Sequence, residues 1–300
     1  MGEKDISEKM LADHNDVFAD IVNVLLFNGK CIVSENELQN TKDKSQYKAD
    51  GMMHEQERDL SKIWKKCNVN ISFFGMENQT DIDDHMPLRV MGYDGAVYRS
   101  QYKKADTKAY PVITVILNFS RERWEKNKNL SDIMNVPEEL KPYFHDYGIN
   151  VFDICYLSDE QVAMFQSDFG IVAEYFVKTT KDPEHYTPER KTIRHVNEIL
   201  KLMKVLTGDS RYEDVANELV KKGGAVTMCE VLERVELKGR EEGREEGREE
   251  GRKEGRKEGR EEGRFKLLLE LVSDGTITIQ KAAETAGMDE AAFKKKMNEM

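Results

Sequence analysis

Apolar residues in four segments of the chain either recur with the two-residue period of a β-strand or form short continuous runs. The clearest segment is VNISFFGM, in which Val69, Ile71 and Phe73 occupy alternate positions. Residues 65–68 separate it from a weaker segment upstream, and a connection of this length suits a hairpin. The predicted strands are 57–64, 69–76, 110–119 and 149–157.

Helical periodicity, with apolar residues three and four positions apart, governs much of the remaining chain. Asn15 is the expected N-cap of the first such segment, and Asn28-Gly29 is its expected stop. Ser158 is the expected cap of the later helices. The polar residues 36–56 predict mostly loop. The predicted helices are 15–27, 86–102, 137–143 and several within 158–222.

The order of these elements predicts an α/β fold, in which helices flank a small mixed sheet. We expect the sheet and its helices to form a core over residues 1–157, and helices alone to form an annex over residues 158–235. A repeat linker or assembly helix follows at 236–264, and a small helical tail at 265–300.

Residues 239–264 repeat a four-residue unit, GREEGREEGREEGRKEGRKEGREEGR, which we call the array. Glu and Arg three positions apart attract one another on a helix, but each interior glycine costs about 1 kcal/mol relative to alanine. Two interpretations stay open. The array is a solvated, partly helical spacer, or its glycine stripe lets helices of different chains approach closely. Without an apolar seam it is not an ordinary coiled coil.

The tail resumes an apolar pattern, with Gly287 between two helical segments. Helix, glycine-containing turn and helix form the outline of a helix-turn-helix. Many small helical hairpins share this outline. Two roles for the tail therefore stay open, which are DNA recognition, and packing or assembly.

The composition of the chain bears on its possible contacts with nucleic acid, membranes and zinc. The formal net charge is −11, so contact with nucleic acid needs a local basic patch that neutralises phosphates. Residues 86–108 offer one, with five basic and two acidic side chains. No apolar run approaches the ~20 residues of a membrane span, and no apolar signal segment is seen, so we expect a cytoplasmic protein without membrane contact. The four cysteines and six histidines show no zinc-binding spacing.

Glu77 and Gln79 end the clearest strand. Residues two apart point to the same side of a strand, and the hairpin would bring Asp59 alongside them. Two carboxylates and an amide suit Mg²⁺, which prefers oxygen ligands and keeps several waters. A metal held in this way can activate water against a phosphodiester. Ordinary polarity at the end of a strand is the alternative interpretation.

Several segments together resemble a known family. RD at 58–59, followed by an apolar strand that ends in ENQ at 77–79, resembles the pattern of PD-(D/E)XK nucleases. The wider sequence is similar to the Rpn family of recombination-promoting nucleases and putative transposases over about residues 14–235. The segments that carry this similarity are GMENQTD, DHMPLRVMGYD, YPVITVILNF, INVFDICYLSDEQV and the array.

The resemblance implies a restriction-endonuclease-like αβββαβ core and Mg²⁺-dependent cleavage of DNA. Asp59 and Glu77 would bind the metal, and Gln79 would stand where such nucleases usually have lysine. Glutamine can orient water but offers no positive charge, so slow catalysis is expected. The alternative function is a catalytically weak DNA-binding or assembly protein, in which the array and the tail carry the activity.

Further side chains are candidates for the same site. An acidic residue on the first helix often completes sites of this kind, and Asp20 is a better candidate than Asp16. A solvated helix face is the alternative for both. Arg89 and Tyr93 lie four residues apart on one helix face and could reach a phosphate. Their alternative role is a structural hydrogen bond between helix and sheet.

Self-association through the array is testable. If Arg and Glu columns pair between chains, the full chain forms homo-oligomers that weaken at high salt, because salt screens exposed charges. Deleting residues 239–264 should then lower the sedimentation mass at low salt to that of a single chain. An equal assembly state with and without the array would contradict self-association.

Overall fold

The chain divides into two units, Met1–Val235 and Glu236–Met300, which are described separately. The structure is a computed structural model, and Asn68, Lys103, Lys104 and Asp106 of the segments discussed above lie outside the residues it describes. The described residues are 3–41, 44–49, 52–67, 69–102, 108–182, 186–188, 191–222 and 224–298.

The first unit is built on a five-stranded mixed sheet, so the predicted α/β class is confirmed. The strand order is β1-β4-β5-β6-β7. The first three of these strands pair antiparallel, and the last three pair parallel. They are β1 (Leu38–Asn40), β4 (Leu60–Lys66), β5 (Val69–Gln79), β6 (Val112–Asn118) and β7 (Asn150–Asp153).

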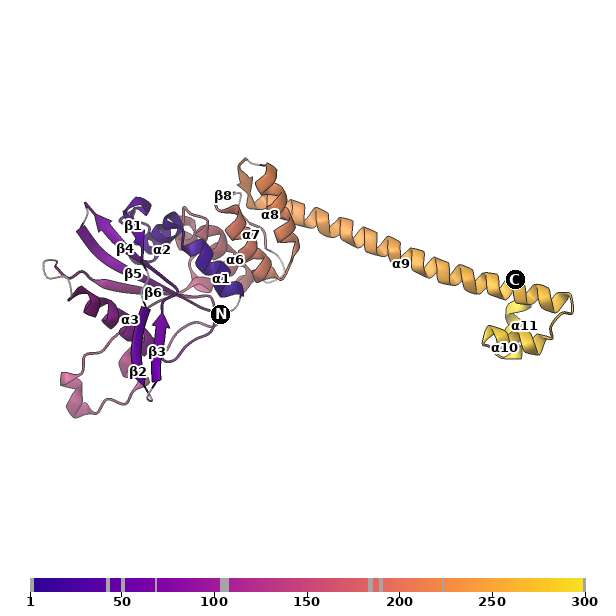
Figure 1. Cartoon of the computed structure of the whole chain (residues 1–300), viewed down its shortest axis with the longest axis horizontal. Coiled ribbons are helices and arrows are strands. Elements are labelled where there is room, and N and C mark those ends of the chain that lie inside the picture. The colour runs from indigo at the N-terminus through magenta and orange to yellow at the C-terminus, as the bar shows by residue number, and fades with distance from the viewer. Residues whose placement is uncertain are drawn as a thin grey trace. The chain divides into compact units, whose positions relative to one another are not determined.

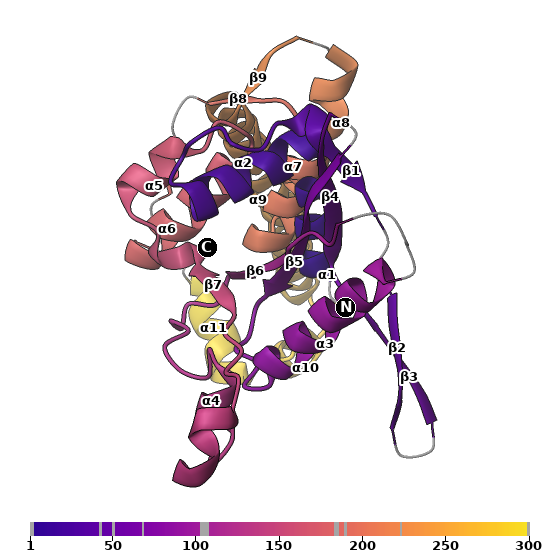
Figure 2. The same cartoon turned by 90° about the vertical axis from the view of Figure 1, so that its left-hand side faces the viewer.

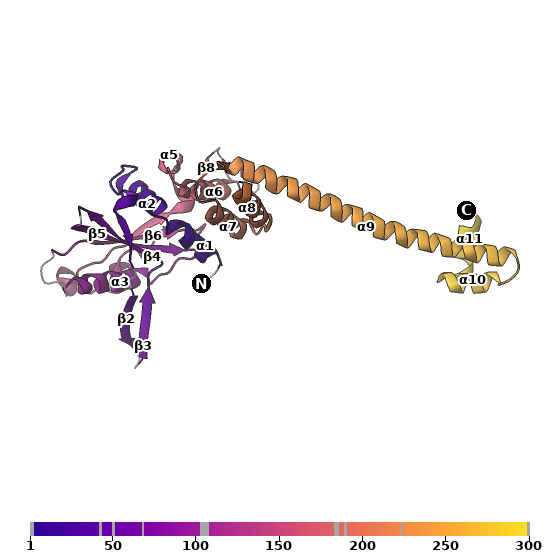
Figure 3. The ribbon, with the colours of Figure 1, turned by 45° about the horizontal axis from the view of Figure 1, so that its top comes forward.

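Helices cover both faces of this sheet (Figures 1 and 3). On one face lie α1 (Glu3–Ala12) and α2 (Asn15–Phe27), and on the other lies α3 (Met86–Gln101). The other helices of this unit are α4 (Leu130–Ile133), α5 (Asp159–Met164), α6 (Phe169–Lys181), α7 (Val196–Thr207) and α8 (Arg211–Lys222), with 3₁₀ turns η1 (Glu35–Glu37), η2 (Glu138–Tyr143) and η3 (Ile154–Tyr156). A small two-stranded sheet pairs β8 (Thr192–Ile193) with β9 (Val226–Thr227).

Alternate side chains of β5 enter different apolar clusters. Phe74 and Met76 belong to the main core, which also contains Phe18 of α2 and Ile199 of α7. Phe73 faces the other way and packs near Val97 of α3. The main core therefore contains helices from both sides of residue 157, the predicted boundary between the core and the annex. From Phe73 onward, the odd-numbered side chains of β5 lie on the α3 side of the sheet.

Residues 36–56 were expected to be mostly loop, and this prediction is wrong. They contain β1 and a two-stranded ribbon of β2 (Lys44–Ala49) and β3 (Met52–Glu57), visible beside α3 in Figure 2. The sequences KSQYKA and MMHEQE lack alternating apolar positions, and β2 and β3 pair with each other and do not join the main sheet. Glu57 ends β3, so β4 begins only at Leu60.

The ends of α2 show one correction and one confirmation. His14, not Asn15, precedes the helix. Asn15 is its first residue, and its side-chain amide donates to the carbonyls of Glu35 and Leu38. Asn28 ends α2 in the left-handed conformation, as expected. Ser158 caps α5 as predicted, since its hydroxyl accepts a hydrogen bond from the backbone of Gln161.

The array is fully helical. It lies within α9 (Met228–Ser273), and residues 240–264 are all exposed. A Cβ added to Gly243 or Gly263 would meet nothing within 4 Å. In the second unit, the end of α9 packs against α10 (Ile279–Ala286) and α11 (Glu290–Asn298), with the rings of Phe265 and Phe293 4.9 Å apart. The predicted helical hairpin of the tail is present, and Gly287 ends α10.

A buried ion pair ties α3 to the sheet. The guanidinium of Arg58, just before β4, donates to the carboxylate of Asp94 in α3, and both side chains are almost fully buried. The hydroxyls of Thr114 and Tyr147 also donate to Asp94. Because one carboxylate serves three donors from separate elements, it fixes the place of α3 on the sheet.

Gly75 of β5 makes room for this arrangement. A Cβ at position 75 would lie 2.7 Å from Cδ and Nε of Arg58 and 3.0 Å from the hydroxyl of Thr114. The Arg58 guanidinium carbon lies 5.1 Å from the ring centre of Phe73 and 5.2 Å from that of Tyr93. A side chain at position 75 would therefore displace arginine from between two rings.

We predict that Gly75→Ala destabilises the first unit by roughly 1–3 kcal/mol, because the added methyl group overpacks a buried site. Gly95→Ala in α3 is the matched control, since a Cβ there meets nothing within 4 Å. Alanine in a helix should be neutral or stabilise by up to about 1 kcal/mol. Urea unfolding followed by fluorescence of Trp64 and Trp124 measures both. Equal stability of the two variants would contradict the packing argument.

Candidate active site

A pocket of about 390 Å³ lies where β5 ends beside α1 and α3. Three of the predicted site residues, Asp59, Glu77 and Gln79, line it, and so does Arg89. Tyr93 contacts Arg89 through its hydroxyl, 3.3 Å from a guanidinium nitrogen. The remaining lining residues are Lys9, Asn78, Thr80, Asp81, Ile82 and Asp83.

Strand pairing explains why these residues converge. Leu60 of β4 pairs with Met76 of β5, which places Asp59 across from Glu77. A hydrogen bond of 2.9 Å from the backbone N–H of Asn78 to Asp59 Oδ2 closes this end of the strand pair. The predicted strand was expected to end at residue 76. Instead β5 continues to Gln79, so Glu77 and Gln79 are successive residues on its α3 side.

Glu77 is a buried carboxyl group with an incomplete set of partners. Its residue exposure is 1%. Oε2 lies 3.4 Å from Arg89, whereas Oε1 is buried and has no hydrogen-bond partner among the described residues. Burial, together with the negative charge of Asp59, raises the pKa of Glu77 to about 7, against the opposing effect of Arg89 and Arg58. Glu77 therefore changes its charge near neutral pH.

Lys9 brings a positive charge to this pocket that the sequence did not reveal. Its ammonium lies 2.6 Å from Asp59 Oδ1, and both side chains are about one-sixth exposed. Lys9 belongs to α1, a helix that the apolar pattern did not predict. Because Gln79 is neutral, Lys9 and Arg89 are the two cationic side chains that line the described part of the pocket.

Arg89 is held by acidic and phenolic partners. It donates to Asp83 at 2.8 Å and to the Tyr93 hydroxyl at 3.3 Å, while its side chain stays about one-third exposed. Tyr93 is buried. These contacts fit the structural alternative for Tyr93, and they also leave the Arg89 guanidinium open to a solute in the pocket.

Comparison with known families adds one finding. Residues 62–206 match the family described as "Putative transposase, YhgA-like". The resemblance to putative transposases is thereby confirmed. The matched segment contains Glu77, Gln79 and Arg89, whereas Lys9 and Asp59 precede it. Neither a curated protein nor a solved structure matches the chain.

Sites of the nuclease type predict an acid from the first helix, but the structure does not bring Asp16 or Asp20 to this pocket. Both line a separate pocket. Asp20 Oδ2 accepts hydrogen bonds from the backbone N–H groups of Gln166 and Ser167, at 2.9 and 2.7 Å. Asp16 and Asp20 lie on α2, whereas the helix whose side chain contacts Asp59 is α1. The helix taken as the first from the sequence is α2, because α1 precedes it.

Among the described helices, none combines the length and the apolar character that crossing a bilayer requires.

The raised pKa of Glu77 gives a testable dependence of stability on pH. The folded-state pKa of about 7 exceeds the ordinary value of 4.5, so the folded state binds the proton more tightly than the unfolded state. Stability from protonated Glu77 is present below about pH 4.5 and is lost as pH rises through 7. Between pH 5 and 8, in chelator, the wild type should lose up to ~3 kcal/mol relative to Glu77→Gln.

Urea unfolding followed by tryptophan fluorescence at pH 5, 6, 7 and 8 measures this difference. Glu122→Gln is the matched control, because Glu122 is exposed and its substitution should give the same difference at every pH. A Glu77→Gln difference that does not change with pH would show that Glu77 is ionised throughout this range.

Proposed function

We propose that the protein is a Mg²⁺-dependent DNA endonuclease of the PD-(D/E)XK type, associated with recombination or mobile elements. The observation that carries this proposal is the convergence of Asp59, Glu77, Gln79 and Arg89 in one pocket. If the β2–β3 ribbon is left out, the order α2, β1, β4, β5, α3, β6 supports the proposal, because it resembles the αβββαβ order of restriction-endonuclease-like cores. The transposase family match supports the association with mobile elements.

The residues fit a magnesium ion. Glu77 has a buried oxygen without a hydrogen-bond partner in the described chain, and Asp59 adds a second carboxylate at the same strand end. Asp59 and Glu77 would hold the ion, which prefers oxygen ligands and keeps several waters. When bound, Mg²⁺ would stabilise negative charge on a phosphodiester and make a bound water more acidic.

Four side chains of the pocket would have separate roles in the proposed reaction. Glu77 becomes a better cation ligand as it ionises near pH 7. The Gln79 amide can orient a water molecule by donating or accepting a hydrogen bond. Arg89, fixed by Asp83, can bind a phosphate oxygen. The Lys9 ammonium, 2.6 Å from Asp59, supplies the positive charge that Gln79 lacks.

A specific observation also favours the second candidate, a DNA-binding or assembly protein with little catalytic activity. Lys9 already neutralises Asp59, so the ammonium and a metal ion would compete for the same carboxylate. In this case the exposed array and the helical tail would mediate assembly and DNA contact, and the pocket would serve stability alone.

Cleavage of supercoiled plasmid DNA tests the proposal. The wild type should nick or cut the plasmid with Mg²⁺ and not with chelator. Asp59→Ala should lower the rate by roughly 100-fold or more, because the proposed metal site loses one of its two carboxylates. Lys9→Gln should slow cleavage while keeping its dependence on Mg²⁺, and Glu122→Gln should leave the rate unchanged.

DNA binding by the same proteins separates the two candidates. Binding without cleavage in the wild type, unchanged in Asp59→Ala, would overturn the nuclease proposal and support the binding protein. Full cleavage by Asp59→Ala would exclude Asp59 as a metal ligand and would overturn the proposed two-carboxylate site.

A further inference from the structure

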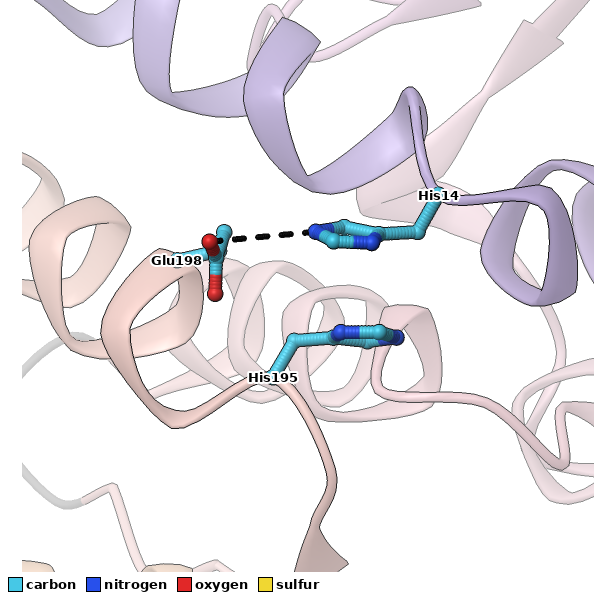
Figure 4. Close-up of side chains that lie close together, drawn as sticks. All are labelled: His14, His195 and Glu198. Atoms are coloured by element: carbon cyan, nitrogen blue, oxygen red, sulfur yellow. Dashed lines mark ion pairs between the residues drawn. The ribbon is translucent and has the colours of Figure 1, made fainter. Parts of the chain in front are cut away.

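Three side chains far apart in the sequence form a second cluster of metal-binding type. His14 lies between α1 and α2, His195 precedes α7, and Glu198 is in the first turn of α7 (Figure 4). Their ligand atoms all lie within 4.8 Å of one another. In the part of the chain that the structure describes, no other group of three or more His, Cys, Asp or Glu side chains meets this distance.

Asp16 prepares His195 for this role. Its carboxylate oxygens lie 3.0 and 3.1 Å from Nε2 of His195, and both side chains are only 15% exposed. A carboxylate at Nε2 favours the tautomer that carries its proton there, so Nδ1 keeps its lone pair. A carboxylate behind a histidine is the arrangement that orients histidine ligands in metal sites.

His14 and Glu198 complete the cluster from two elements. Nε2 of His14 lies 3.8 Å from Glu198 Oε1, the pair joined by the dashed line in Figure 4. The imidazole rings of His14 and His195 stack, with centres 3.7 Å apart and planes 23° from parallel. A metal lies near the plane of each imidazole that binds it, so one ring must turn. His14, at 36% side-chain exposure, has more room to turn than His195.

We propose that His14, His195 and Glu198 bind one Zn²⁺ ion. Two imidazole nitrogens and one carboxylate oxygen are a common zinc ligand set, and a water completes the tetrahedron. Magnesium is disfavoured because it prefers oxygen ligands. The ion joins the α1–α2 corner to the start of α7 and so fastens the N-terminal helices to the annex. This site is independent of the pocket around Glu77 and of the function proposed for it.

Zinc titration of the full chain, first stripped of metal with chelator, tests the proposal by calorimetry. The wild type should bind one equivalent with micromolar or tighter affinity. Glu198→Gln and His195→Ala should each weaken binding at least 10-fold. Asp16→Asn should weaken it roughly 10- to 100-fold, because it acts through His195. His145→Ala, at an exposed histidine outside the cluster, should bind as the wild type does.

Thermal unfolding provides a readout without titration. Zinc should raise the melting temperature of the wild type and not that of Glu198→Gln, because a ligand of the folded state stabilises it by mass action. Circular dichroism without metal checks that the variants fold, and Glu198→Gln, on a helix surface, keeps the test valid if His195→Ala does not fold. Equal zinc affinity in Glu198→Gln and the wild type would overturn the proposal. Loss of zinc binding in Glu77→Gln instead would assign the ion to the other pocket.

Discussion

The buried ion pair between Arg58 and Asp94 is the contact on which the candidate active site depends. It holds α3 against the sheet, and α3 carries Arg89 and Tyr93. Two charges removed from water are costly, and breaking such a pair by removing one partner typically costs 3–5 kcal/mol. Here the cost is offset by two hydroxyl donors to Asp94 and by two aromatic rings around the guanidinium. Arg58 therefore has a packing role in this structure.

For Glu77, in contrast, the cost of burying a charge is not offset by close contacts. It is as buried as Arg58, but its contact to Arg89 is long, one of its oxygens has no hydrogen-bond partner among the described residues, and a second negative charge lies nearby. A carboxyl group in this position lowers stability once it ionises, and an apolar residue would pack there at less cost. Strongly shifted pKa values of this kind concentrate at sites that bind a cation or a substrate or that transfer a proton. The burial and raised pKa of Glu77 therefore favour a functional role, whereas its position at a strand end alone does not.

The sequence predicted the part of the site that depends on local geometry. The two-residue period put Glu77 and Gln79 on one side of a strand, and a hairpin of plausible length brought Asp59 beside them. Lys9 was missed because α1 has little apolar periodicity, and Asp20 was chosen because the helix it occupies was taken as the first. The ribbon of β2 and β3 was missed for a similar reason, since its sequence has no alternating apolar pattern. His14 and His195 are 181 positions apart, so no spacing rule could join them; only the packing of α1 on α7 does so.

The close approach of Arg58 to Gly75 has a consequence for the evolution of this fold. A residue with a side chain at position 75 and an arginine at position 58 exclude one another, because the space that one needs is filled by the other. Neither position can change alone without cost, although the two are 17 residues apart, with Arg58 just before β4 and Gly75 within β5. Related sequences should therefore keep the pair together or replace both members, and this covariation would trace the ancestry of the α3 anchor.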